Sequence, residues 1–205
     1  VSYPVPRPGV RGWFSKGEFV AVTGADFAVL SGQTLGVIGE SGSGKSTLAL
    51  ATLGLIPFGG DLRLLERTWG QGVSQDRTLR KAVQVVFQDP FSSLNPIMIV
   101  GKQIMEALTL SLGMDKNSAK ARALELLHAV GIPDPETRFY QYPFQLSGGM
   151  RQRIVIAIAL ASDPEILICD EPTTALDVTI QAKILDLIKE IKAQRKLSII
   201  FITHD

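Results

Sequence analysis

Short apolar runs alternate with longer amphipathic stretches along most of the chain. The short runs predict buried strands at residues 34–38, 82–87, 166–169 and 198–202. The longer stretches predict helices at residues 46–56, 97–112, 118–130, 147–161 and 178–193. Because strands that alternate with helices usually form parallel sheets, we expect an α/β fold with a mostly parallel sheet.

Three stretches depart from this alternation. Residues 18–39 predict an N-terminal subdomain of antiparallel strands that lead into the strand 34–38. Residues 91–145 predict a helical subdomain inserted into one domain, which covers residues 1–205. Residues 59–75 are polar and rich in turn residues, and they carry no firm prediction. The chain starts without methionine and stops just after an apolar strand, so we expect a domain trimmed at both ends.

The composition narrows the class of protein. With 205 residues, 45% of them hydrophobic, the chain can bury the core of a medium α/β domain. Its 21 lysines and arginines nearly balance 20 acidic residues, which gives no sign of nucleic-acid binding. The single cysteine, Cys169, predicts a buried thiol in a cytosolic protein. The apolar stretch 154–161 is far too short to span a bilayer, so a membrane role would need a partner.

The stretch GESGSGKST lies between a predicted strand and a predicted helix. The backbone amides of such a turn and the positive end of the helix form a site for a polyphosphate. The spacing matches G-x-x-x-x-G-K-[ST], the P-loop pattern. We expect Lys45 to reach the β- and γ-phosphates, Ser46 to bind Mg²⁺ and Thr47 to reach the α-phosphate. The alternative is a glycine-rich turn with a surface lysine, which the flanking strand and helix disfavour. The predicted nucleotide-binding residues are Gly39, Glu40, Ser41, Gly42, Ser43, Gly44, Lys45, Ser46 and Thr47.

Two acidic residues, Asp170 and Glu171, follow the predicted strand 166–169. Ligands of open parallel sheets gather at the carboxyl ends of the strands. We therefore expect Asp170 to lie near the phosphates and hold Mg²⁺, directly or through water. Glu171 is then in a position to polarise an attacking water molecule.

The stretch LSGGMRQR opens the predicted helix 147–161, with Ser147 in a capping position and Gly148 and Gly149 behind it. One interpretation is an ordinary N-cap with a flexible lead-in. The other is a second phosphate-binding surface at a positive helix end. One nucleotide hardly needs two such surfaces from one chain. We therefore expect a dimer in which this surface closes over the P-loop of a partner.

These motifs resemble the ATP-binding cassette (ABC) family, the motor subunits of ABC transporters. The resemblance runs nearly from end to end, although the family's signature usually ends in glutamine where this chain has Met150. The stretches FQDPFSSLNP and DEPTTALDVTIQ are similar to the peptide and nickel importer group. The motifs stand in the family's order: the P-loop, Gln88 of the Q-loop, the signature 146–150, the Walker B strand 166–171, the D-loop 175–177 and the switch histidine His204.

The resemblance implies a P-loop NTPase with a RecA-like core that hydrolyses ATP and uses Mg²⁺. It assigns the catalytic roles to Lys45, Gln88, Glu171 as general base, and His204. It assigns Mg²⁺ to Ser46, Gln88 and Asp170. It implies that Ser147, Gly148 and Gly149 cap the γ-phosphate of the partner's ATP, and that Gln88 and Asp177 are further nucleotide-binding residues. Tyr3 matches the residue that stacks on adenine, with Trp13 and Phe14 as the other candidates.

The resemblance also implies the partners and the location. The partners are a second ABC ATPase domain, identical or not, integral membrane permease subunits and, indirectly, an extracytoplasmic solute-binding protein; no nucleic acid is expected. The protein is expected to lie peripherally on the cytoplasmic face of the inner membrane. Its cargo is expected to be peptides or a similar small solute such as nickel.

Two other uses of the same cassette stay open as alternatives. DNA-repair ATPases place long coiled coils or zinc modules between P-loop and signature, and the segment between Lys45 and Ser147 is far too short for these. Translation-associated cassette proteins usually carry two cassettes and a basic linker. A third possibility is a plain nucleotide kinase, but that function does not explain the presence of the LSGGM stretch.

Overall fold

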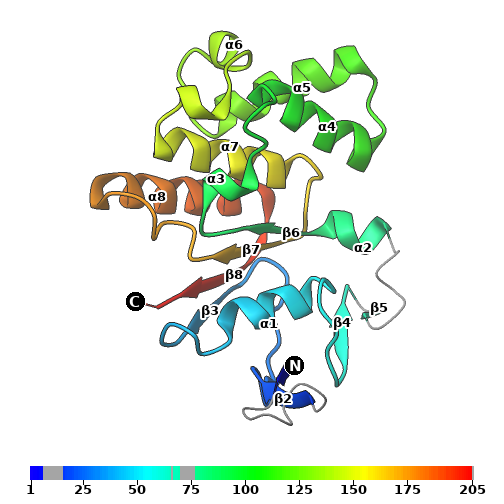
Figure 1. Ribbon diagram of the computed structural model, residues 1–205. Helices are drawn as coiled ribbons and strands as arrows, with labels where there is room; N and C mark the ends of the chain where they lie inside the picture. The colour runs from blue at the N-terminus through cyan, green and yellow to red at the C-terminus, as the bar shows by residue number, and fades with distance from the viewer. Residues whose placement is uncertain (7–15, 66, 70–76, 205) are drawn as a thin grey trace.

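The computed structural model describes residues 1–6, 16–65, 67–69 and 77–204 (Figure 1). A four-stranded parallel sheet forms its centre, with the strand order β3-β8-β7-β6. This confirms the α/β fold with a mostly parallel sheet, and each predicted strand is present to within about one residue at either end. The strands are β3 (Thr34–Ile38), β6 (Val83–Val86), β7 (Ile166–Asp170) and β8 (Ser198–Thr203).

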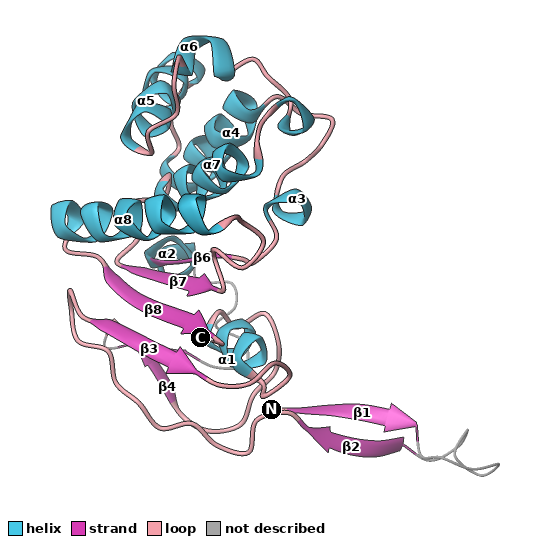
Figure 2. Cartoon of the chain, turned by 90° about the vertical axis from the view of Figure 1, so that its left-hand side faces the viewer, coloured by secondary structure: helices cyan, strands magenta, loops and turns pink. Residues whose placement is uncertain are grey.

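Helices cover both faces of this sheet. In Figures 1 and 2, α8 lies along one face, α1 lies against the other, and the remaining long helices stack beyond α7. In the described ranges, no helix has the length and hydropathy needed to cross a bilayer. The helices are α1 (Lys45–Thr52), α2 (Arg77–Ala82), α3 (Pro90–Ser93), α4 (Val100–Leu112), α5 (Lys116–Ala129), α6 (Pro135–Arg138), the 3₁₀ helix η3 (Pro143–Gln145), α7 (Gly148–Leu160) and α8 (Val178–Arg195).

The prediction of antiparallel strands over residues 18–39 is only partly right. β2 (Lys16–Val20) pairs antiparallel with β1 (Ser2–Pro6), but residues 21–33 form no strand. β3 joins the parallel sheet, because its partner is β8 from the far end of the chain. Alternation along the sequence predicts a strand, but it does not identify the strand with which it pairs. A second hairpin, β4 (Leu62–Leu64) with β5 (Arg67–Trp69), lies in the stretch that carried no firm prediction.

Two predicted helix boundaries are wrong. The helix predicted to run to residue 56 ends at Thr52, because Gly54 adopts the left-handed conformation (φ +65°) and stops the helical path. The helix predicted from residue 97 begins only at Val100. Before it, the backbone N–H of Ile97 donates to Oδ1 of Asn95 (3.1 Å), which is turn rather than helix geometry.

Alternating side chains of the central strands build a core on each face of the sheet. Leu167 and Cys169 pack with the helices α4, α5, α7 and α8, whereas Ile168 packs with α1 and β4. The strands are therefore apolar on both sides, as a parallel sheet covered by helices requires. Burial raises the pKa of the Cys169 thiol to about 12, so this side chain acts as an ordinary core residue.

Candidate nucleotide site

The loop between β3 and α1 depends on its glycines. Gly44 has φ +94°, and a Cβ there would lie 2.5 Å from the carbonyl oxygen of Ala21. A Cβ at Gly39 would lie 2.8 Å from Oγ of Ser43. The backbone N–H of Ser43 donates to the carbonyl of Glu40 (3.2 Å) and closes the turn. The loop therefore ends at the amino terminus of α1, where the helix dipole places a partial positive charge.

Lys45 is held inside this loop. Its Nζ donates to the backbone carbonyls of Gly39 (2.7 Å) and Glu40 (2.8 Å), and only 8% of the residue is exposed. The same nitrogen lies 3.7 Å from Oε1 of Glu171. One ammonium group therefore links the P-loop to the acidic end of β7.

Asp170 and Ser46 meet at the carboxyl end of β7. Asp170 is 5% exposed, and its Oδ1 is buried without a hydrogen-bond partner among the described residues. Burial raises the pKa of Asp170, and the charge of Glu171 raises it further, while a hydrogen bond with Ser46 and the charge of Lys45 act in the opposite direction. A buried carboxyl oxygen beside a hydroxyl fits a hard cation.

Glu171 has an unusual backbone conformation. It is a non-glycine residue with φ +47°, and its N–H donates to the carbonyl of Ile202 (3.0 Å) in the neighbouring strand. Strained conformations of this kind are typical of functional positions. Oε2 of Glu171 accepts from Oγ1 of Thr174 and lies 3.1 Å from Nδ1 of His204. The side chain of His204 is half-exposed at the end of β8.

The structure therefore brings five predicted residues together at one edge of the sheet: Lys45, Ser46, Asp170, Glu171 and His204. Gln88 follows the edge strand β6 at the same end of the sheet, and it is exposed. The arrangement can bind a polyphosphate and a divalent cation, with one carboxylate left to accept a proton.

The residues of the LSGGM stretch form a second surface. Ser147 caps α7, and its Oγ accepts from the N–H of Met150 (3.4 Å). A Cβ at Gly149 would lie 2.6 Å from Cγ2 of Ile180 on α8, so close helix packing is a second reason for this glycine. Asp177 is exposed at the amino end of α8. Ser147 bonds within α7, and Gly148 and Gly149 face Leu176 and Ile180 rather than the P-loop.

The three residues predicted to contact adenine lie where the structure describes no side chain. Tyr3 lies on β1 opposite Phe19 in the strand register, but its side chain is outside what the structure describes. Trp13 and Phe14 lie outside the described residues.

Sequence reasoning missed two contacts at this site. One is Thr174, three residues after Glu171, whose hydroxyl donates to the carboxylate of that acid. The other is the pairing of Arg151 with Phe91, for which the sequence offers only an arginine near the start of a helix whose second half is apolar.

The comparisons with known proteins agree with one another. The family model described as "ABC transporter" matches residues 22–174. The oligopeptide transport ATP-binding protein OppD of Bacillus subtilis (strain 168) is 50% identical over 202 residues, which cover 92% of this chain and 55% of that protein. The dipeptide transport ATP-binding protein DppD of Escherichia coli (strain K12) is 46% identical over 195 residues, covering 91% of this chain and 59% of that protein. The chain thus spans little more than half the length of these relatives.

Two solved structures are similar over the whole fold. The dimeric post-hydrolysis state of the ATP-binding cassette MJ0796, bound to ADP and Pi, has a TM-score of 0.80 and 26% identity. The alignment covers 100% of this chain and 86% of that one. CbiO1 from Clostridium perfringens, part of the ABC transporter complex cbiONQ, has a TM-score of 0.78 and 27% identity, covering 90% of this chain and 72% of that one.

Proposed function

The chain belongs to the ABC transporter family, and we propose that the protein is the ATP-hydrolysing motor of a peptide importer. One observation carries the proposal: the buried Lys45 ammonium joins the carbonyls of the P-loop to Glu171 at the end of β7. This is the geometry that brings phosphate groups next to a proton acceptor. Similarity to oligopeptide and dipeptide transport proteins supports peptides, rather than nickel, as the cargo.

ATP would bind with its phosphates on the loop of residues 39–47. The loop amides and the amino end of α1 supply partial positive charge, and Lys45 supplies a full one. Thr47 is half-buried in the first turn of α1, and its hydroxyl would contact the α-phosphate. Lys45 would exchange its carboxylate neighbour for phosphate oxygens, which frees Glu171 to accept a proton.

The magnesium site would consist of Ser46 and Asp170, with Gln88 at its rim. Oδ1 of Asp170 is buried without a hydrogen-bond partner in the described part of the chain, which supports this assignment, because a cation would supply the partner that this oxygen lacks. A bound Mg²⁺ would neutralise phosphate charge. It would also favour the ionised form of Asp170 against the effect of burial.

Glu171 would act as the general base. Thr174 and His204 both contact its Oε2, so the carboxylate has a fixed direction while Oε1 faces Lys45. A carboxylate held in this way can take the proton of a water molecule that attacks the γ-phosphate. His204 would orient the base and the γ-phosphate.

The second surface would act on the ATP of another copy or of a related cassette. Ser147 and Asp177 are exposed at the amino ends of α7 and α8, and Gly148 and Gly149 are half-buried in the first turn of α7. The dimeric state of the similar cassette MJ0796 supports this arrangement. Two ATP molecules would then be enclosed between two chains, and hydrolysis would open the dimer.

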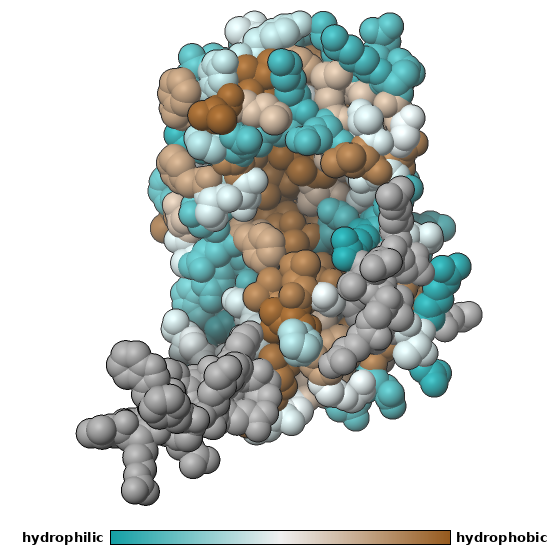
Figure 3. All heavy atoms as spheres, turned by 45° about the vertical axis from the view of Figure 1, so that its right-hand side comes forward, coloured by the Kyte–Doolittle hydropathy of each residue, from teal (hydrophilic) through white to brown (hydrophobic). Residues whose placement is uncertain are grey.

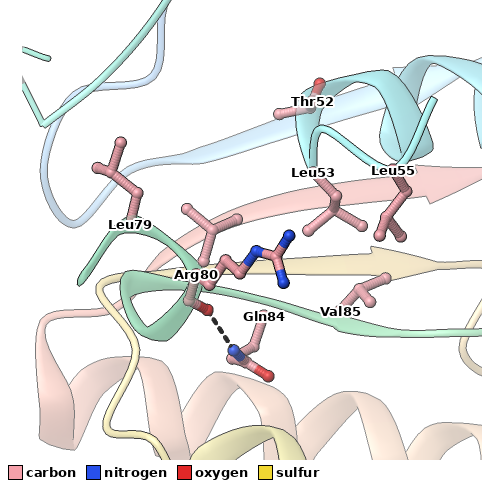
Figure 4. Close-up of a pocket in the computed structure, with 8 residues that line it drawn as sticks. Thr52, Leu53, Leu55, Leu79, Arg80, Gln84 and Val85 are labelled. Carbon is pink, nitrogen blue, oxygen red and sulfur yellow. Dashed lines mark hydrogen bonds between the residues drawn. The ribbon is translucent and has the colours of Figure 1, made fainter. Parts of the chain in front are cut away.

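The permease would dock on an apolar region between the end of α1 and β6. Figure 3 shows apolar side chains gathered in a band through the middle of this face. A hollow of about 170 Å³ lies here, lined by Leu53, Leu55, Leu79 and Val85 among others (Figure 4). Leu55 is 61% exposed, while Nε2 of Gln84 is already bonded to the carbonyl of Arg80 (2.6 Å). Such a docked motor would lie on the cytoplasmic face of the membrane, with a solute-binding protein on the other side.

The relatives support the importer over the other uses of the cassette. The two named above are transport ATP-binding proteins, and neither name refers to DNA repair or translation. A nucleotide kinase would have no use for the surface around Ser147.

The peptide-importer function is tested by measuring ATP hydrolysis in a reconstituted transporter. The full-length protein, reconstituted with its permease and solute-binding protein, is expected to hydrolyse ATP faster when di- to pentapeptides are present. Free amino acids, supplied at the same concentration, are the control. Equal hydrolysis with and without every peptide in the set would contradict the peptide assignment.

A further inference from the structure

Arg151 is a buried arginine whose contacts join two segments of the site. It is 9% exposed in the first turn of α7, and its backbone N–H donates to the carbonyl of Ser147 (3.0 Å). Its Nε donates to the carbonyl of Pro143 (2.6 Å). Its guanidinium carbon lies 3.8 Å from the centre of the Phe91 ring. At this distance a guanidinium stacks on an aromatic face.

Phe91 is linked by hydrogen bonds to the segment that carries Gln88. Asp89 directly follows Gln88. Its carboxylate accepts from the N–H groups of Phe91 (2.9 Å) and Ser92 (3.2 Å) and caps α3. Phe91 is 61% exposed, so burial alone does not hold its ring. The stacked guanidinium gives the ring its defined position.

We propose that Arg151 is a positioning residue that couples the Gln88 segment to the surface around Ser147. This inference rests on the proposed function, in which Gln88 faces the chain's own ATP and Ser147 faces the ATP of the partner. The Phe91–Arg151 stack makes the two segments move as one unit, because α3 and α7 also pack against each other. Binding of ATP in one site thus sets the orientation of the cap on the other.

Phe91→Leu tests this coupling with little risk to folding. The side chain is largely exposed, so leucine keeps the apolar contact and removes the aromatic face. Truncating Arg151 instead would leave the Pro143 carbonyl without its donor. Phe91→Trp keeps the stack. Phe144→Leu is the matched control, because Phe144 is also exposed (68%) but stacks on Tyr142 rather than on Arg151.

The variants are compared in the full-length protein carrying Glu171→Gln. Phe91→Leu is expected to keep the ATP affinity of the parent and to weaken ATP-dependent dimerisation by about five- to tenfold in light scattering. Hydrogen exchange is the second measurement, made at protein concentrations low enough to keep every variant monomeric. ATP is expected to change amide exchange over residues 147–151 in the parent and in Phe91→Trp, but not in Phe91→Leu.

Three results would overturn the coupling: Phe91→Leu behaves like its parent, Phe144→Leu has the same effect as Phe91→Leu, or the parent binds ATP with no change in exchange over residues 147–151. A parent that binds no ATP would instead refute the proposed function itself, and the coupling with it.

Discussion

Replacement of Glu171 by glutamine is expected to lower the rate of ATP hydrolysis by about a hundredfold or more, the usual effect of losing a general base. Glutamine keeps the shape of the side chain, and its oxygen or nitrogen can still meet Thr174 and His204. It has no carboxylate to accept the proton of the attacking water. The rate is measured as phosphate release from the full-length protein in its assembled transporter.

The control for this variant is Glu165→Gln. Glu165 is an exposed acid next to the opposite, amino end of β7, so its loss removes the same charge without touching the site. ATP binding should persist in both variants. A Glu171→Gln protein that hydrolyses ATP at the wild-type rate would show that another group is the base.

Replacement of Lys45 by alanine is expected to reduce ATP affinity by at least about a hundredfold, the range for removing one partner of a buried charge pair. The lysine is the one residue that contacts both the loop carbonyls and Glu171 among the contacts described above. Its loss leaves the carboxylates of the buried Asp170 and the half-buried Glu171 to repel the phosphates. Calorimetric titration with Mg·ATP measures the effect.

Lys189→Ala is the matched control for this measurement. Lys189 lies on α8 with its side chain 77% exposed and pairs only weakly with Asp186 at the surface. Its replacement should leave ATP affinity unchanged. If ATP affinity is also unchanged in Lys45→Ala, the P-loop is not the ATP-binding site.

The strands and the P-loop were predictable because their signals are local. An apolar run bounded by turns defines β3 or β7, and the spacing of Gly39, Gly44 and Lys45 defines the loop between β3 and α1. The meeting of Asp170 with Ser46 followed from one general rule, that parallel strands end at the same edge of a sheet.

Of three features that the sequence did not predict, one is local and two depend on distant parts of the chain. The end of α1 was set by the backbone of Gly54 rather than by the apolar pattern, which continues to Ile56. The partner of β3 comes from the other end of the chain. The stack of Phe91 on Arg151 joins the short helix α3, which follows β6, to α7, which begins more than fifty residues later, and neither residue predicts the other.

The central claim is that two surfaces of this chain act on two different ATP molecules, and the oligomeric state of Glu171→Gln tests it most directly. Because ATP persists in this variant, the full-length protein should shift from monomer to dimer with Mg·ATP and stay monomeric with ADP in multi-angle light scattering. Adding Ser147→Arg should abolish the shift, since a bulky cation would displace the cap at the end of α7. A Glu171→Gln protein that binds ATP and stays monomeric, even with its permease, or a Ser147→Arg double variant that still dimerises, would contradict the claim.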